Sequence, residues 1–324
     1  MKKLALSLLI TIGIILILFT QISIQDLFRL LKNVNPYWAV FGSIVYLLAI
    51  FFRTLRFKWL IHSKKILFSE LFNITVFYHL SLMVLPSKLG ELTYPYLLNR
   101  RGGLSMTEGL ASLIASRVYD FFIVLIIFLF AIIGFQDILQ INLPLTIFLF
   151  ILLILAILFV FSHMSTFLSW ISSLINKITG WTKLKNSKTL HWVQRKIHDM
   201  AEDFYAIKAR RTHVSVSLVS LGAWVMIFYA FYAFLRGFGI EVSVSKVAFG
   251  STIAVIANAL PISGLGNWGT LEAGWAAGFL MVGLPKEDAI ATGFGVHILI
   301  FLICGIMALI CWVFLNLSRQ KQKQ

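Results

Sequence analysis

The fold is decided by two stretches of sequence, LPSKLGELTYPYLL from Leu85 to Leu98 and LPISGLGNWGTLE from Leu260 to Glu272. Each begins with Leu-Pro, reaches Leu-Gly within a few residues and then contains a glutamate. Proline and glycine interrupt a helix, so each stretch predicts a break inside an apolar segment. At membrane depth an irregular backbone is tolerated only inside the protein or along a wet cavity. The two breaks therefore indicate where a functional site should lie.

The rest of the chain has the composition of a membrane protein. Of its 324 residues, 59% are hydrophobic and only 13% are charged. Apolar runs of roughly 16 to 26 residues recur, each about long enough to cross the hydrocarbon core as a helix. The longest polar stretch, about residues 163–213, is too short for a sizeable soluble domain. We therefore expect an all-α, polytopic integral membrane protein that forms a single domain, 1–324.

Six runs predict full spans, and two broken segments, 68–98 and 247–283, predict re-entrant hairpins. The first run follows Lys2 and Lys3 as a signal peptide would, but no small-x-small cleavage pattern follows it, so we predict a transmembrane helix. The only cysteines, Cys304 and Cys311, are too far apart on one helix for a disulfide. The predicted full spans are 4–20, 36–53, 117–135, 143–162, 213–235 and 289–314.

The distribution of Lys and Arg sets the predicted topology. With each broken segment returning to its own side, 22 of the 28 Lys and Arg residues lie on the inner side and 5 on the outer, with Lys88 set apart. Both termini are then cytoplasmic, in the plasma membrane. The two hairpins enter from opposite sides, which predicts an inverted repeat as in alternating-access transporters. Alternatively, each broken segment crosses the membrane twice as two complete short helices. The chain would then have eight or more helices, and every loop would stay on the same side of the membrane.

The same threading divides the chain into two halves and a connection. The first half, 1–135, contains the broken segment 68–98, and the second half, 213–324, contains the broken segment 247–283. Residues 136–212 hold one span and a basic cytoplasmic region. There Val193, Ile197, Met200, Phe204 and Ile207 follow helical spacing, so we expect an amphipathic helix on the inner leaflet that attracts anionic lipids, or a plain positive-inside loop.

Ionisable groups inside membrane segments need a partner or a cavity. Ser105 and Glu108 form a capping box, so a helix should start near Met106 and carry Arg117 and Asp120 on one face. This pair is either a structural anchor or a phosphate site, in which Asp120 orients Arg117.

The broken segments offer further candidate binding groups. A helical turn would place Lys88 and Glu91 together, with Gly90 allowing close backbone approach. The two side chains then either bind substrate or neutralise each other. In the second segment, Gly264 and Asn267 could contact a headgroup through free amide groups, although close packing also explains the glycines. Trp268 is a candidate interfacial anchor. His297, on the last span, is a candidate ligand or a core histidine.

Other activities find little support in the sequence. His191 and His198 lack a third ligand in register, so no metal site is predicted. The formal charge of +15 is dispersed along membrane flanks, which argues against nucleic-acid binding. No P-loop, nucleophile elbow or dinucleotide-binding motif is present, and no cofactor is predicted.

Two regions of the chain resemble a known family. LGELTYPYLLNRRGGLSMTEGLASLIASRVYD and LPISGLGNWGTLEAGWAAGFLMVGLPKEDAIATGFG are similar to the signature regions of the lysylphosphatidylglycerol synthase transmembrane family, whose members are called flippase-like. The resemblance covers about residues 4–317. The matching residues are Gly90, Glu91, Arg100 or Arg101, Arg117, Asp120, Pro261, Gly264, Gly266 and Glu272. Near His297 the family commonly has an arginine, so headgroup affinity here is expected to be altered or pH-dependent.

The resemblance implies a lipid-handling role. In multidomain relatives this membrane region is fused to a domain that transfers an amino acid from aminoacyl-tRNA to a phospholipid, and no such region is recognised here. We therefore expect a non-enzymatic flippase or scramblase for a lipid with an anionic or glycosylated phosphate headgroup. Lys88, Arg100 or Arg101, and Arg117 would hold the phosphate, while Glu91 and Glu272 would gate transport or couple it to protons. An intramembrane transferase, or a subunit presenting lipid to a lipid-modifying enzyme or glycosyltransferase, remains the alternative.

Overall fold

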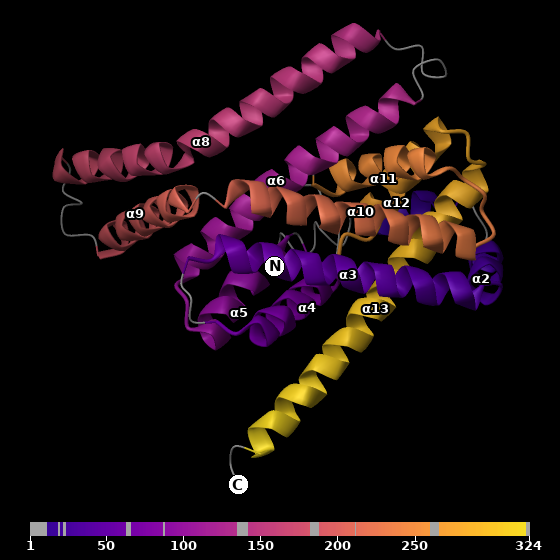
Figure 1. Cartoon of the computed structure of the whole chain (residues 1–324), viewed down its shortest axis with the longest axis horizontal. Coiled ribbons are helices and arrows are strands. Elements are labelled where there is room, and N and C mark those ends of the chain that lie inside the picture. The colour runs from indigo at the N-terminus through magenta and orange to yellow at the C-terminus, as the bar shows by residue number, and fades with distance from the viewer. Residues whose placement is uncertain are drawn as a thin grey trace.

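The computed structural model consists of helices throughout the part of the chain that it describes (Figure 1). That part comprises residues 12–18, 20–21, 24–62, 66–86, 88–134, 142–181, 188–210, 212–259 and 266–321. After a helical stretch at residues 12–18, the elements are α2 (Ile24–Lys32), α3 (Pro36–Leu60), α4 (Phe68–Val84), η1 (Leu89–Leu92), α5 (Thr93–Gly102), α6 (Met106–Ile133), α8 (Leu143–Trp181), α9 (Lys188–Ala209), α10 (His213–Gly237), α11 (Val244–Ala259), α12 (Thr270–Met281) and α13 (Lys286–Lys321).

Five helices of the described residues are long and apolar enough to cross a membrane, namely α3, α6, α8, α10 and α13. They contain five of the six predicted full spans, and the protein is an all-α polytopic membrane protein. The sixth predicted span, 4–20, falls mainly outside the described residues. Four of the predicted spans are markedly shorter than their helices, because α3, α6, α8 and α13 continue beyond their apolar cores into polar sequence. The capping box predicted the start of α6 correctly, since Ser105 Oγ accepts a hydrogen bond from the Glu108 amide at 2.9 Å.

The first broken segment is a hairpin of α4 with η1 and α5. Helix α4 ends at Val84, and the next residue, Leu85, is extended, as the residue before a proline should be. The chain then turns back through Lys88, which has a left-handed φ of 62°. Gly90 lies so close to α4 that a Cβ there would be 2.6 Å from the Ser81 carbonyl oxygen. The return arm is held against α3 by Phe57, which stacks on Tyr94 with ring centroids 4.1 Å apart.

The second broken segment is a tighter hairpin of α11 and α12. Its break at residues 260–265 lies outside the described residues, as do Pro261 and Gly264. Small residues bring the two helices together, since a Cβ at Gly278 would lie 2.3 Å from the Gly250 carbonyl oxygen. A Cβ at Gly274 would lie 2.5 Å from Ala257 Cβ. Such close approach is how membrane helices gain packing where no hydrophobic effect drives them together.

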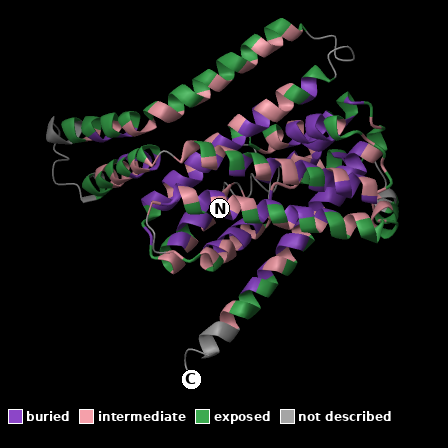
Figure 2. Ribbon diagram, in the orientation of Figure 1, coloured by how far each residue is buried: buried purple, intermediate pink, exposed green. Residues whose placement is uncertain are grey.

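Helices α8 and α9 form an arm at the edge of the molecule. In Figure 2 most of α8 is exposed, whereas the buried residues gather in the bundle of α3, α4, α6 and α10 to α13. The predicted amphipathic helix is confirmed as α9, but its apolar stripe does not face outward. Phe204 and Ile207 are buried against α6, α8 and their neighbours, with Ile197 and Met200 packed beside them. Protein, and not the lipid surface, covers this stripe.

Gly278→Ala should weaken the α11–α12 hairpin. The added methyl group meets the Gly250 backbone, which can move only if a helix moves, so we expect a loss of about 1–3 kcal/mol in stability. Thermal unfolding of the purified protein, followed by tryptophan fluorescence, measures this. Gly305→Ala is the matched control, because a Cβ at this helical glycine has nothing within 4 Å. Equal melting temperatures for the two variants would contradict the packing argument.

Candidate functional site

The tips of the two broken hairpins meet inside the bundle. The Gly266 amide donates to the Leu85 carbonyl at 3.2 Å, and the Asn267 side-chain amide donates to the Leu82 carbonyl at 3.3 Å. Lys88 reaches back across the junction, donating to the Asn258 carbonyl and lying 3.4 Å from Asn267 Oδ1. Carbonyl groups freed at helix breaks thus find partners on the opposite hairpin, as burial in a membrane requires.

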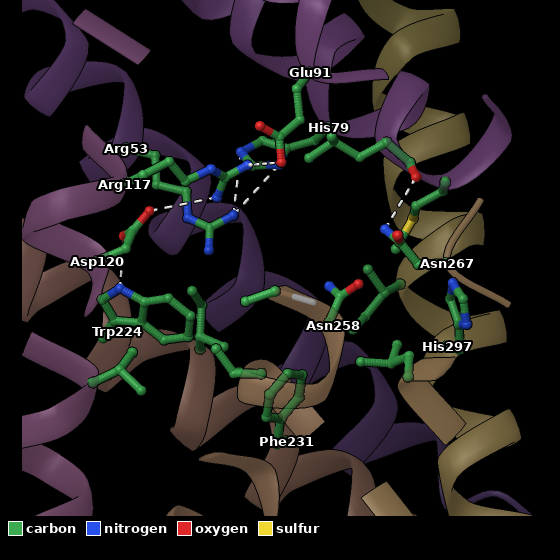
Figure 3. A pocket seen from close by; sticks show the side chains of 18 of the residues that line it. Arg53, His79, Glu91, Arg117, Asp120, Trp224, Phe231, Asn258, Asn267 and His297 are labelled. Carbon is green, nitrogen blue, oxygen red and sulfur yellow. Dashed lines mark hydrogen bonds and ion pairs between the residues drawn. The ribbon is translucent and has the colours of Figure 1, made fainter. Parts of the chain in front are cut away.

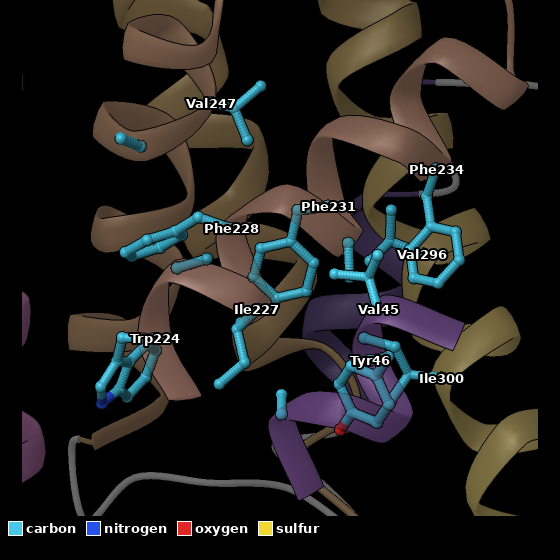
Figure 4. Packing of buried hydrophobic residues seen from close by; sticks show 14 of the residues in the cluster. Val45, Tyr46, Trp224, Ile227, Phe228, Phe231, Phe234, Val247, Val296 and Ile300 are labelled. Carbon is cyan, nitrogen blue, oxygen red and sulfur yellow. The ribbon is translucent and has the colours of Figure 1, made fainter. Parts of the chain in front are cut away.

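A cavity of about 350 Å³ opens beside this junction. Side chains from α3, α4, α6, α10, α11, α13 and both hairpin tips line it. Its apolar wall continues into the buried core, where Tyr46, Ile227, Phe231 and Ile300 lie together (Figure 4). The polar side chains are grouped on two sides, with Arg53, Arg117, Glu91 and Asp120 on one side and Asn258, Asn267 and His297 on the other (Figure 3).

The arginine side of the cavity is organised by Asp120. This buried carboxylate accepts two hydrogen bonds from Arg56, at 2.5 and 3.2 Å, and one from Trp224 Nε1 at 2.7 Å. Arg117 lies farther off, with Nη1 3.6 Å from Asp120 Oδ2. The predicted Arg117–Asp120 pair is therefore present, but Arg56 is the stronger partner because it binds in the bidentate geometry.

Arg117 is held by side chains of the first hairpin. Its Nη2 donates to the Tyr78 hydroxyl at 2.7 Å and lies 3.3 Å from Glu91 Oε1. Arg53 lies next to it, with Nη1 3.4 Å from both ring nitrogens of His79 and the guanidinium 5.5 Å from the Trp224 ring centroid. The Nε atoms of Arg53 and Arg117 are buried without a hydrogen-bond partner among the described residues. Two guanidinium groups thus keep donor capacity at the cavity.

The other side of the cavity is built on the second hairpin and α13. Asn258 Oδ1 is buried with no hydrogen-bond partner in the described part of the chain. His297 stacks on Trp268 with ring centroids 4.0 Å apart. Its Nδ1 lies 2.5 Å from Glu272 Oε1, and Glu272 Oε2 accepts from the Gly269 amide at 2.7 Å. Glu272 thus caps α12 and orients the His297 ring instead of lining the cavity.

The structure brings together six of the residues singled out from the sequence: Lys88, Glu91, Arg117, Asp120, Asn267 and His297 line the cavity. Gly90 and Gly266 serve the hairpin turns, Gly266 with a φ of +57°. Arg100 and Arg101 lie away from the cavity, on the rings of Tyr96 and Phe77. Pro261 and Gly264 lie outside the described residues. The expectation that Lys88 and Glu91 share one helical turn was wrong, because Lys88 precedes the turn in a left-handed conformation and contacts the second hairpin.

Sequence reasoning missed Arg53, Arg56 and His79. The two arginines follow a long apolar run and were counted as loop charges, although they lie within α3. Their spacing of three residues on a helix was the available signal, since it predicts a shared face. His79 stands in an apolar segment of α4 with no charged neighbour, and only the fold places Arg53 against it.

A comparison with protein-family models identifies the family. The model of the lysylphosphatidylglycerol synthase TM region matches residues 4–308. The chain belongs to this family. A search of curated proteins and a search of solved structures found no match. Membership of the lysylphosphatidylglycerol synthase TM family indicates a role related to membrane lipids, and the matched region is the family's membrane domain.

Asp120→Asn should destabilise this family member strongly. The change leaves Arg56, only 2% exposed, without its bidentate carboxylate partner, and breaking a buried ion pair costs about 3–5 kcal/mol. A large fall in folded yield and melting temperature after detergent extraction is the expected result. Asp199→Asn is the control, because its pair with Lys196 is over 40% exposed and worth little. A melting temperature that matches the control would show that Asp120 is not the anchor of the arginine cluster.

Proposed function

We propose that this protein moves a phosphate-bearing lipid between the two leaflets of a membrane. The observation that carries the proposal is the cavity between two interrupted hairpins, with Arg53, Lys88 and Arg117 at membrane depth. Buried arginines with spare donors are costly in hydrocarbon and are retained where they serve a pathway or a ligand. Family membership supports a lipid as the ligand.

The cavity size favours a headgroup as the part that is bound. A volume of about 350 Å³ is near the lower limit for small-molecule sites. It accommodates a phosphate with a small substituent, whereas acyl or prenyl chains need far more room. The chains would therefore stay in the bilayer, beside the exposed apolar faces of the bundle, while the headgroup passes through the protein. No covalent chemistry is required of the cavity residues, and we propose no enzymatic activity.

The hairpin junction is suited to open during transport. It is held by single hydrogen bonds, from Gly266 to Leu85, from Asn267 to Leu82 and from Lys88 to Asn258. The two neutral bonds are worth only about 0.5–1.5 kcal/mol net each and the Lys88 bond about 1.5–3 kcal/mol, so an incoming phosphate that replaces some of them can release the tips. Glu91 would act as the gate, since it competes with the phosphate for Arg117.

The proposed setting follows from the charge distribution of the sequence. The positive-inside pattern favours cytoplasmic termini in a plasma membrane, with the two hairpins entering from opposite sides as an inverted repeat. The halves 1–135 and 213–324 would then move relative to each other around the cavity, with 136–212 as their connection. Anionic lipids are the proposed partners.

A transport assay in proteoliposomes tests the function. Fluorescent phospholipids in the inner leaflet are protected from an external quencher, and their exposure over time reports movement. We expect Arg117→Gln to slow exposure by about tenfold or more, because the forked contact to phosphate is lost. Glu91→Gln should change the rate by removing the competitor of the phosphate. Arg236→Gln, a change at a surface pair with the exposed Glu241, should leave the rate unchanged.

Two results would reject the transport proposal. One is a wild-type rate no faster than that of empty vesicles for every phosphate lipid offered. The other is equal rates for wild type and Arg117→Gln, with folding checked by size-exclusion chromatography. Conversion of the lipid into a new product by the purified protein would instead support an intramembrane transferase.

A further inference from the structure

The ion pairs around the cavity leave two of its cations without a carboxylate. In the described part of the chain, the charged side chains that line the cavity or contact its charged groups directly are four cations, Arg53, Arg56, Lys88 and Arg117, and two carboxylates, Glu91 and Asp120. Glu272 lies behind the cavity and is compensated separately by the His297 ring and the N-terminus of α12.

The two carboxylates are already occupied. Asp120 binds Arg56 in a bidentate pair, and Glu91 binds Arg117. Arg53 and Lys88 have only neutral hydrogen-bond partners: Arg53 contacts the His79 ring, and Lys88 contacts the Asn258 carbonyl and Asn267 Oδ1. Asp120 attracts Arg53 and Glu91 attracts Lys88 only from beyond ion-pair distance. Neither forms an ion pair with any described residue. A membrane cavity with two unpaired cations is most stable when an anion supplies the missing charge.

The positions of the two cations matter as much as their number. Arg53 lies beside Arg117 on one side of the cavity, with Asn258 and Asn267 on the other (Figure 3). Lys88 contacts Asn258 and Asn267. A headgroup between them meets positive charge from both sides. The residues on both sides also hold buried polar atoms without a hydrogen-bond partner in the described part of the chain, the Nε atoms of Arg53 and Arg117 and the Oδ1 atom of Asn258. The first two are donors and the third is an acceptor, so phosphate or hydroxyl groups would satisfy them once the side chains turn toward the cavity.

We propose that the cavity selects a lipid headgroup with two negative charges, as in a phosphate monoester or a diphosphate, over the singly charged phosphodiester of common phospholipids. Arg53 and Arg117 bind its oxygens on one side and Lys88 on the other, so that the two unpaired cations are neutralised together. This inference rests on the proposed lipid-transport function and adds the charge class of the lipid.

Binding measurements with two short-chain lipids test the proposal. Dioctanoyl phosphatidic acid carries a phosphate monoester, and dioctanoyl phosphatidylglycerol carries a phosphodiester on the same chains. At about pH 8, where the monoester is a dianion, we expect phosphatidic acid to bind at least about tenfold more tightly to the purified full-length protein. At about pH 5, where the monoester has taken up one proton and is a monoanion, this preference should fall while binding of phosphatidylglycerol changes less.

Variants of the two unpaired cations locate the effect. Arg53→Gln and Lys88→Gln should each abolish most of the preference for phosphatidic acid while leaving phosphatidylglycerol bound, because one excess charge remains for a singly charged headgroup. Lys32→Gln, at an exposed lysine ending α2, is the matched control and should keep the full preference. Melting temperatures confirm that each variant is folded before its binding is compared.

Several outcomes would overturn the charge-class proposal. Equal affinity of wild type for the two lipids would do so, as would an unchanged preference in folded Arg53→Gln and Lys88→Gln. Glycerol phosphate that binds as tightly as phosphatidic acid would assign the site to a soluble phosphate. The first two results would not contradict transport of phosphatidylglycerol in the vesicle assay. This inference can therefore fail while the proposed function stands.

Discussion

The hydrogen bond from the Gly266 amide to the Leu85 carbonyl joins two helix breaks that lie in opposite halves of the chain. Backbone groups at membrane depth have no water to bind, so each break is tolerable only if the protein supplies partners. Leu82, Leu85 and Asn258 all offer carbonyl groups that find donors across the junction. The position of the cavity, the close packing of each hairpin and the polar lining all follow from this pairing.

Charge compensation is the second constraint, and Asp120 is at its centre. Its carboxylate is shared by Arg56 and Trp224 at hydrogen-bond distance and by Arg117 at a longer distance. Because Asp120 binds Arg56 in the bidentate geometry, Arg117 depends on Tyr78 and Glu91 for its closer contacts, and Arg53 has no carboxylate within ion-pair distance. The same carboxylate therefore stabilises the bundle and leaves two arginines at the cavity less fully paired than Arg56.

Glycine sets how closely the arms of each hairpin can approach. Gly90 lets the return arm of the first hairpin lie against α4, and Gly278 lets α12 lie against the Gly250 backbone. Each hairpin is thereby a closely packed unit, while the hydrogen bonds that join the two units at their tips are few and single. Strong packing within each hairpin and weak bonding between them is the combination that relative movement of two halves requires.

The sequence by itself determined the helical membrane fold, the two breaks and six residues of the cavity lining, because apolar run length, proline, glycine and buried charge are local signals. Charged residues in an apolar chain are visible in the sequence wherever they lie in space, as are Lys88, Glu91, Arg117 and Asp120. Only the tertiary structure decided which of them are partners. In the folded chain Arg53 and His79 line the cavity, and Glu272 lies behind His297. The apolar stripe of α9 packs against other helices. Pairing between distant segments depends on packing across the bundle, which no local pattern records.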